Sequence, residues 1–315
     1  MENAPLISIC IPAYERAEYL KRLLDSIQSQ HFRNFEVIIT DDSRGDEVKN
    51  LVSGHAIFSK VHYYKNRQTL GSPENWNEGL RKSTGDWIKP MHDDDWFQGP
   101  GSLGVYAQVS ENTAASFAFS SFTNVYPDGS RRFIDNAGHV RMLNRNPEAL
   151  IASNRIGPPS CILFRRDDSL FFDNQMKWLV DIDFYIRYLK AHGKALYISE
   201  PLVQIGISET QVTQSSFGNP QIEIPERFLL QEKMHHNSLN NILIYDSWWR
   251  FIRNMKIRST DQISAAGFSG NIPLVIKNII GVQNKIPRPM LKTGVISKLL
   301  MGSNFLFRHG KNENG

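Results

Sequence analysis

The 315-residue sequence has little cysteine and no long apolar run. Its two cysteines, Cys10 and Cys161, lie far apart in strand-like segments, which excludes a disulfide framework or a cysteine-based metal site and indicates a reducing cytoplasm. No stretch reaches the roughly 18 apolar residues of a membrane span. Residues 1–5 lack the basic start and apolar core of a signal peptide, so we expect no secretion signal.

The sequence also lacks a glycine-rich loop after its first apolar segment. Dinucleotide-binding and Walker-type loops require glycines at that point, whereas this chain has Pro12-Ala13-Tyr14-Glu15. A ligand phosphate would therefore not be held in a nest of backbone N–H groups. A metal ion held by carboxylates is the natural substitute.

Acidic residues are scarce in the C-terminal part. From Arg250 to the end there are eleven Lys or Arg and two acids, a net charge of +9 in a chain of +4, so the remainder carries −5. Such a basic tail predicts an anionic partner, either a membrane surface or nucleic acid. Apolar helical faces edged by Lys and Arg favour the membrane surface, while packing against the main domain is the alternative. Few aromatic residues interleave with the charges, so no nucleic acid is expected.

Four apolar runs alternate with stretches of helical periodicity in the first hundred residues: Leu6–Ile11, Phe35–Thr40, Val61–Tyr64 and Trp87–Met91. This alternation predicts an α/β fold with a parallel sheet covered by helices on both faces. Ligands of such sheets bind beyond the carboxyl ends of the strands. Three of these ends carry Pro12-Ala13-Tyr14, Asp41-Asp42 and Asp93-Asp94-Asp95, so we expect these groups to meet in one crevice.

The three adjacent aspartates are the most informative group. Like charges this close raise one another's pKa, so the arrangement gains nothing as a plain turn. Hard divalent ions such as Mg²⁺ and Mn²⁺ take oxygen ligands and complete their coordination with substrate phosphates. A solvated acidic loop is the alternative.

Several segments resemble family 2 glycosyltransferases of the GT-A fold, in matching order and spacing: Ser8–Arg16, Ser26–Gln30, Phe35–Ser43, Asn77–Gly79, Gly85–Ile88 and Asp94–Trp96. The resemblance covers about the first hundred residues. It implies a Rossmann-like nucleotide-binding half followed by a mixed acceptor half. The implied activity is transfer of a sugar from a nucleotide-diphosphate donor, with inversion at the anomeric carbon.

The resemblance also assigns roles to individual residues. Tyr14 would stack on the base, Asp42 would accept a hydrogen bond from it, and Asp94 would contact the ribose. Asp95, with Asp93, would ligate Mn²⁺ or Mg²⁺. The full expected donor site consists of Pro12, Ala13, Tyr14, Arg16, Asp42, Asn77 and Asp94. The family often has Asp at the position of His92, so which aspartate pair faces the metal stays open.

A second chemical segment runs from Trp178 to Leu189. It resembles the family's Glu-Asp-x-Asp-x-x-x-x-Arg pattern, with Asp181 as catalytic base and Asp183 and Arg187 on the acceptor side. Val180 replaces the usual Glu. A base is chemically required, because the acceptor hydroxyl must lose its proton as it attacks. Helix capping by Asp181 is the alternative.

Two other segments fit the acceptor half. Ser160 follows a small-residue turn that resembles one near the acceptor, although a rigid connector explains it equally well. Residues 208–220, rich in Ser, Thr, Gln and Gly, would form a lid. Family members often have a His before this lid; here Glu209, water or His92 would replace it.

These observations predict a GT-A catalytic domain over residues 1–220, with halves 1–100 and 101–220, and a helical basic region over 221–315. We expect a cytoplasmic enzyme that uses a nucleotide sugar, with UDP favoured, and a glycan or lipid-linked acceptor of a bacterial surface polysaccharide. One alternative is a non-catalytic nucleotide-sugar or glycan-binding protein with a degenerate site. Another is a sugar-phosphate nucleotidyltransferase, which usually needs the missing glycine-rich loop.

Overall fold

The computed structural model describes residues 6–111, 115–208 and 216–312. The chain divides into two compact units. The first consists of Met1–Pro147, Arg155–Met176 and Val180–Gln211, and the second of Glu148–Asn154, Lys177–Leu179 and Val212–Gly315. The predicted division after residue 220 stays a prediction.

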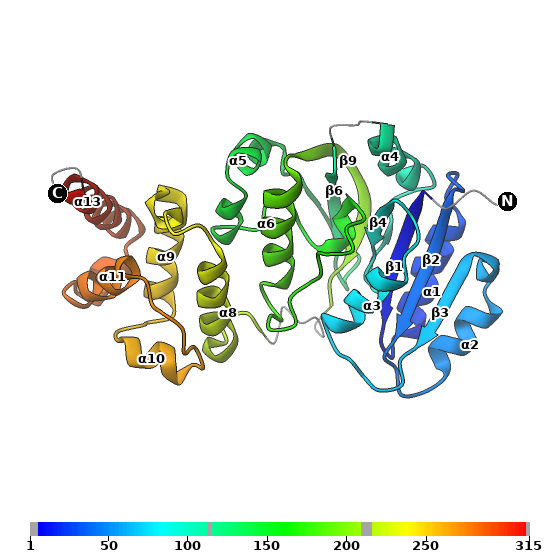
Figure 1. The fold of residues 1–315 in the computed structure, drawn as a ribbon, viewed down its shortest axis with the longest axis horizontal. Helices are drawn as coiled ribbons and strands as arrows, with labels where there is room; N and C mark the ends of the chain where they lie inside the picture. Colours follow the sequence, from blue (N-terminus) through cyan, green and yellow to red (C-terminus); the bar gives the residue numbers. More distant parts are fainter. Residues whose placement is uncertain (1–5, 112–114, 209–215, 313–315) are drawn as a thin grey trace. The chain divides into compact units, whose positions relative to one another are not determined.

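The N-terminal half of the first unit contains four parallel strands in the order β3-β2-β1-β4 (Figure 1). The strands are β1 (Ile7–Ala13), β2 (Phe35–Asp41), β3 (Val61–Lys65) and β4 (Trp87–Pro90), and the helices between them are α1 (Ala17–Gln28), α2 (Glu47–Gly54) and α3 (Glu74–Lys82). The predicted parallel α/β arrangement is confirmed.

Continuous burial explains the strand pattern. Every residue of β2 and β4 is buried, which is why these strands appear in the sequence as apolar runs rather than alternating ones. In α1, by contrast, only one face is buried, through Leu20, Leu23, Leu24 and Ile27. That face follows the helical period of 3.6 residues and covers the sheet.

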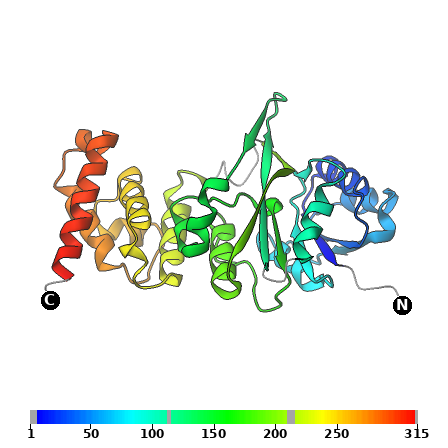
Figure 2. The same ribbon diagram turned by 90° about the horizontal axis from the view of Figure 1, so that it is seen from above.

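Beyond β4 the same sheet becomes mixed. Its order continues β4-β8-β6-β9-β5, where β8 is antiparallel to β4 and β6, and β6 is parallel to β9. Figure 2 shows the β6–β7 hairpin projecting from this sheet. The elements of this half are β5 (Trp96–Phe97), α4 (Ser102–Gln108), β6 (Phe117–Val125), β7 (Arg131–Ile134), α5 (Val140–Arg145), β8 (Ile162–Arg165), α6 (Val180–His192) and β9 (Ala195–Gly206).

The second unit is helical in its C-terminal part, as expected. Its core forms around α9, which buries Tyr245, Trp248, Trp249 and Ile252. The helices are α8 (Pro220–Lys233), α9 (Ile242–Asn254), α10 (Thr260–Ala265), α11 (Leu274–Asn284), α12 (Arg288–Lys292) and α13 (Gly294–Asn312). In the described part of the chain, none of the helices combines the length and apolarity needed to cross a membrane.

Candidate active site

The carboxyl ends of three neighbouring strands bring the predicted site segments together. Parallel pairing of β1 with β4 continues past the strand end, where the N–H of Met91 donates to the carbonyl of Cys10 (2.9 Å). On the other side of β1, the N–H of Asp42 donates to the carbonyl of Ala13 (3.0 Å). The loop after β1, the turn at Asp42 and the turn formed by His92–Asp95 after β4 (the aspartate turn) therefore lie along one edge of the sheet.

The aspartate turn is buried rather than solvated. Asp93, Asp94 and Asp95 all expose less than a tenth of their surface. Arg16, from the loop after β1, donates hydrogen bonds to the carboxylates of Asp93 and Asp94. Its Nη1 donates to Asp94 (3.0 Å), and its Nε (3.2 Å) and Nη2 both donate to Asp93. Arg16 therefore neutralises part of the charge, and its pairing explains how two adjacent carboxylates tolerate burial.

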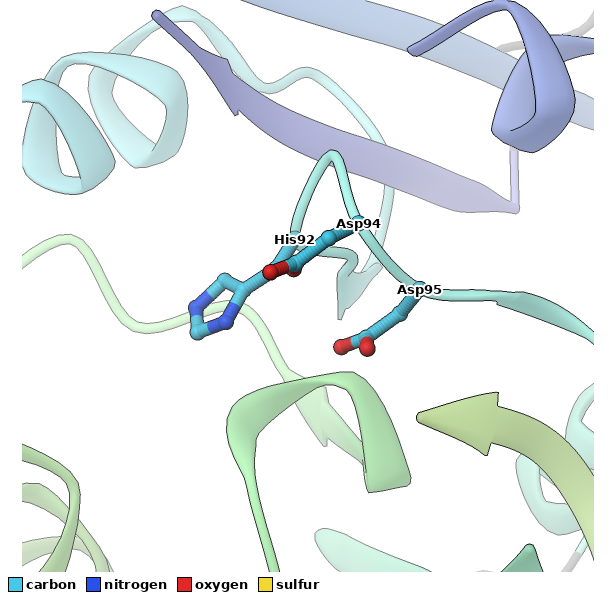
Figure 3. A group of neighbouring side chains, drawn as sticks. All are labelled: His92, Asp94 and Asp95. Atoms are coloured by element: carbon cyan, nitrogen blue, oxygen red, sulfur yellow. The ribbon is translucent and has the colours of Figure 1, made fainter. Parts of the chain in front are cut away.

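A second group of side chains could hold a metal ion. His92, Asp94 and Asp95 each offer one ligand atom, and these atoms lie within 4.8 Å of one another (Figure 3). Asp93, which was predicted to pair with Asp95, lies outside this group of three; Arg16 binds it, as it binds Asp94, and its role as a ligand stays a prediction.

The surroundings of this group fit a divalent cation. Burial, together with the neighbouring Asp94, raises the pKa of Asp95 well above its usual range. Burial also lowers the pKa of His92, which keeps the imidazole neutral and able to donate a lone pair. The Nε2 atom of His92 is buried and has no hydrogen-bond partner among the described residues. Two carboxylates and a neutral imidazole form a donor set that suits Mn²⁺ or Mg²⁺.

Residues outside the turn fix the orientation of Asp95. The carboxylate of Asp95 accepts hydrogen bonds from the Ser160 hydroxyl and, at 3.1 Å, from the N–H of Gly206 at the end of β9. A Cβ at Gly206 would overlap the carbonyl oxygen of Asp94, so only glycine allows β9 to approach this closely. The predicted acceptor-side residue Ser160 thus contacts the aspartate turn itself.

Lys89, on β4, was not predicted from the sequence. It is fully buried, and its Nζ donates to the carbonyls of Ser160 and Pro90, the latter at 3.2 Å. Burial lowers its pKa to about 7. The signal that could have revealed it is a lysine in the middle of an otherwise apolar strand.

Asp42 lies at the predicted base-binding position but is already engaged. Its carboxylate accepts hydrogen bonds from the side chain of Asn66 (2.6 Å) and from the N–H groups of Leu70 (3.1 Å) and Gly71 (2.8 Å). The loop from residue 66 to 71 is therefore anchored on Asp42. Tyr14 is exposed beside this turn, in keeping with a surface that a base could cover.

Asn77 has a different environment from the one expected for a donor contact. It is buried in α3, where its Nδ2 donates to the carbonyl of Phe172 and its Oδ1 accepts from the N–H of the same residue, both at 2.9 Å. These two bonds attach the segment before α6 to α3. A direct contact of Asn77 with a donor stays a prediction.

In the acceptor half, Asp181 lies in the first turn of α6 and is half-buried, and its carboxylate accepts from the N–H of Ile182 (2.8 Å). Asp183 is fully buried in an ion pair with Arg187 (2.6 Å), and Arg187 also donates to the carbonyl of Phe171 (2.7 Å). The Asp183–Arg187 pair thus orders the start of α6. Most of the predicted lid, including Glu209, lies outside the described residues.

A model of glycosyl transferase family 2 matches residues 8–170, half of the sequence. The chain belongs to this family. The resemblance read from the motifs is confirmed, and the protein is a glycosyltransferase.

Relatives and solved structures agree with this assignment. The chain is 27% identical over 203 residues to the amylovoran biosynthesis glycosyltransferase AmsB of Erwinia amylovora, covering 62% of this chain and 67% of that protein. The fold matches S. aureus TarS 1–349 in complex with UDP-GlcNAc (TM-score 0.58, 15% identity, 91% and 92% of the two chains). It also matches the mannosyltransferase PcManGT of Pyrobaculum calidifontis in complex with GDP-Man and Mn²⁺ (TM-score 0.58, 13% identity, 99% and 88%). The predicted GT-A fold is therefore confirmed.

Proposed function

We propose that this glycosyltransferase inverts the anomeric centre, uses a divalent metal and moves a sugar from a UDP-sugar to a hydroxyl of a glycan or lipid-linked acceptor. One observation carries the proposal: a base-binding candidate (Asp42), a cation (Arg16) and the group His92, Asp94 and Asp95 occupy adjacent strand ends. TarS in complex with UDP-GlcNAc, a structure of the same fold, supports the choice of UDP.

The metal would be held by His92, Asp94 and Asp95, with Asp93 as the further candidate. When bound, it would neutralise negative charge on the leaving diphosphate. His92 would supply the nitrogen ligand that the family usually provides from the lid. A nitrogen among the ligands favours Mn²⁺ over the harder Mg²⁺.

The donor nucleotide would lie over β1 and β2. Tyr14 would stack on the base, Asp42 would accept a hydrogen bond from it, and Asp94 would contact the ribose. The backbone at Pro12 and Ala13 would lie beneath the nucleotide. Because the Asn77 side chain is hydrogen-bonded to the backbone of Phe172, its contribution would be to hold the segment before α6 in place beside the site.

Asp181 would act as the general base. Its position in the first turn of α6 leaves the carboxylate half-buried, so an acceptor hydroxyl could reach it. It would take the hydroxyl proton as that oxygen attacks the anomeric carbon from the face opposite the diphosphate. The ion pair between buried Asp183 and Arg187 would keep this turn in place.

Residues 1–220 would form the catalytic domain. The relationship to a glycosyltransferase of amylovoran biosynthesis supports a role in bacterial surface polysaccharide synthesis. A lipid-linked acceptor would place the enzyme at the inner face of the cell membrane.

The test is a thermal-shift screen of nucleotide sugars with and without Mn²⁺, because ligands that bind the native state raise its melting temperature. We expect a UDP-sugar to stabilise the protein, and more so with Mn²⁺. The best ligand is then incubated with Mn²⁺ and followed by NMR, where the anomeric configuration of the released or transferred sugar reports inversion. Binding without any turnover would favour a non-catalytic binder, and retention of configuration would contradict the proposed mechanism.

A further inference from the structure

Large apolar side chains are unevenly exposed in the described part of the chain. Four of the thirteen exposed ones belong to the first unit, and nine to the second. These nine are Phe217, Ile242, Leu243, Leu274, Met290, Val295, Leu299, Leu306 and Phe307. Scattered single exposed residues need no explanation, but a concentration of them indicates a binding surface.

Three of the nine lie on one side of α13. Val295, Leu299 and Leu306 follow one another at intervals of four and seven residues, so they lie within about 40° of one another around the helix axis. They are exposed by 73%, 67% and 69%. We call these three residues the α13 stripe.

The opposite face of α13 is firmly packed. Ser297 accepts hydrogen bonds from Nε1 of Trp249 (3.0 Å) and Nη1 of Arg253 (3.1 Å), both on α9. Asn304 donates to the hydroxyl of Tyr245 (2.7 Å), also on α9. The helix therefore already has its partner in the second unit, and the α13 stripe faces away from that partner.

The charged residues of the segment that contains the stripe are of one sign. No Asp or Glu occurs between Asp261 and Glu313. Five exposed cations lie on or beside α11, α12 and α13: Lys277, Lys285, Arg288, Lys292 and Lys298. Exposed apolar residues on one side of a helix, in a segment that carries exposed cations and no acid, are the pattern of a helix that lies in the interface of an anionic membrane.

We propose that α11–α13 dock on an anionic lipid bilayer, with the α13 stripe entering the headgroup region and the surrounding lysines contacting lipid phosphates. A second copy of the chain would offer acids but would bury only a narrow stripe, and nucleic acid would not use exposed leucines. The proposal does not depend on the proposed function, because lipid binding requires neither donor nor metal.

The experiment is co-sedimentation of the full-length protein with vesicles of phosphatidylcholine alone or mixed with phosphatidylglycerol. We expect binding to the mixed vesicles, release by added salt, and little binding to phosphatidylcholine. Leu299→Ser should weaken binding about tenfold, since it removes most of a buried leucine's contribution. Lys292→Gln and Lys298→Gln should each weaken it about fivefold.

Substitutions are preferable to truncation, because removing α11–α13 would uncover Trp249, which Gln283 and Ser297 contact. Phe133→Ser is the matched control: Phe133 is an exposed aromatic residue of β7 in the first unit. It should leave vesicle binding unchanged, and all variants should keep the wild-type melting temperature. Equal binding by wild type and Leu299→Ser would overturn the proposal. Two other results would also overturn it. One is a protein that does not bind vesicles but forms oligomers in light scattering, and the other is a protein that binds DNA and not vesicles.

Discussion

The hydroxyl of Ser160 donates a hydrogen bond to the carboxylate of Asp95. The same oxygen accepts the N–H of His92 at 2.9 Å, so one hydroxyl connects both ends of the aspartate turn. The buried Nζ of Lys89 also donates a hydrogen bond to the carbonyl of Ser160. A short turn before β8 thus determines where two candidate metal ligands lie.

Ser160→Ala should therefore weaken metal binding while leaving the fold intact. Residues that orient a metal ligand typically contribute about 10- to 100-fold to metal affinity. The unpaired N–H of His92 should also lower the free energy of unfolding by about 1–3 kcal/mol. Titration of Mn²⁺ in the presence of UDP measures the first effect, and denaturant unfolding the second.

Ser120→Ala is the matched control for that experiment. Ser120 is also fully buried, and its hydroxyl pairs with that of Tyr106 (2.7 Å), but it does not contact the aspartate turn. We expect a comparable loss of stability and unchanged Mn²⁺ affinity. Equal losses of Mn²⁺ affinity in both variants would mean that Ser160 acts only through general stability.

Lys89→Met should flatten the pH dependence of stability. Burial lowers the Lys89 pKa from 10.5 to about 7 in the native protein. Between these values the unfolded chain holds a proton that the native protein has released, so the free energy of unfolding should rise with pH in the wild type. The variant lacks this group, and urea unfolding at pH 7 and pH 9 should show a smaller rise. An unchanged rise would assign the effect to another residue.

Gly206→Ala should disrupt the site through a single methyl group. That methyl would overlap the carbonyl oxygen of Asp94, so either β9 or the aspartate turn must move, at a cost of about 1–3 kcal/mol. We expect a lower melting temperature and lost Mn²⁺-dependent nucleotide binding.

Gly104→Ala is the control for this change. Gly104 lies in α4 with nothing within 4 Å of an added Cβ, and alanine favours helices, so stability should stay equal or rise by about 1 kcal/mol. If Gly206→Ala also keeps its stability and its Mn²⁺-dependent nucleotide binding, the site does not require the close approach of β9 to Asp94.

Asp181→Asn should keep nucleotide and metal binding but lose transfer, because an amide cannot accept the hydroxyl proton. The expected loss in kcat is on the order of 10²-fold or more. Asp183→Asn should differ, since it breaks the ion pair between this buried carboxylate and the partly exposed Arg187 and should lower the free energy of unfolding by about 1–3 kcal/mol. Full turnover by Asp181→Asn would remove it from the catalytic role.

The sequence predicted those parts of the fold that depend on continuous burial or helical period. β1, β2 and β4 appear as apolar runs, and α1 shows its buried face through Leu20, Leu23, Leu24 and Ile27. The two-residue strand β5 gives no such signal, because it is too short to show a period and exists only through its pairing with Val203 and Gln204 of β9.

Site residues that directly follow a strand could be predicted from the sequence. Contacts between segments distant in the sequence could not. The position of Asp42 and of the aspartate turn follows from parallel strands, whose carboxyl ends share one edge. The contacts of Ser160 and Gly206 with the aspartate turn, and that of Lys89 with Ser160, depend on long-range pairing of β8 and β9, which no local pattern reveals. Similarly, local spacing could not show that Arg16 binds both Asp93 and Asp94, or that His92 lies with Asp94 and Asp95.

The proposed function requires that the nucleotide donor bind through a metal on the aspartate turn. Calorimetric titration of wild type and Asp95→Asn with UDP and, in parallel, GDP, each with and without Mn²⁺, tests it most directly. We predict that Mn²⁺ tightens binding of one nucleotide to the wild type by about tenfold or more, and that Asp95→Asn abolishes this gain while keeping its melting temperature. An equal gain from Mn²⁺ in Asp95→Asn, or none in the wild type, would show that no metal on the aspartate turn holds the nucleotide.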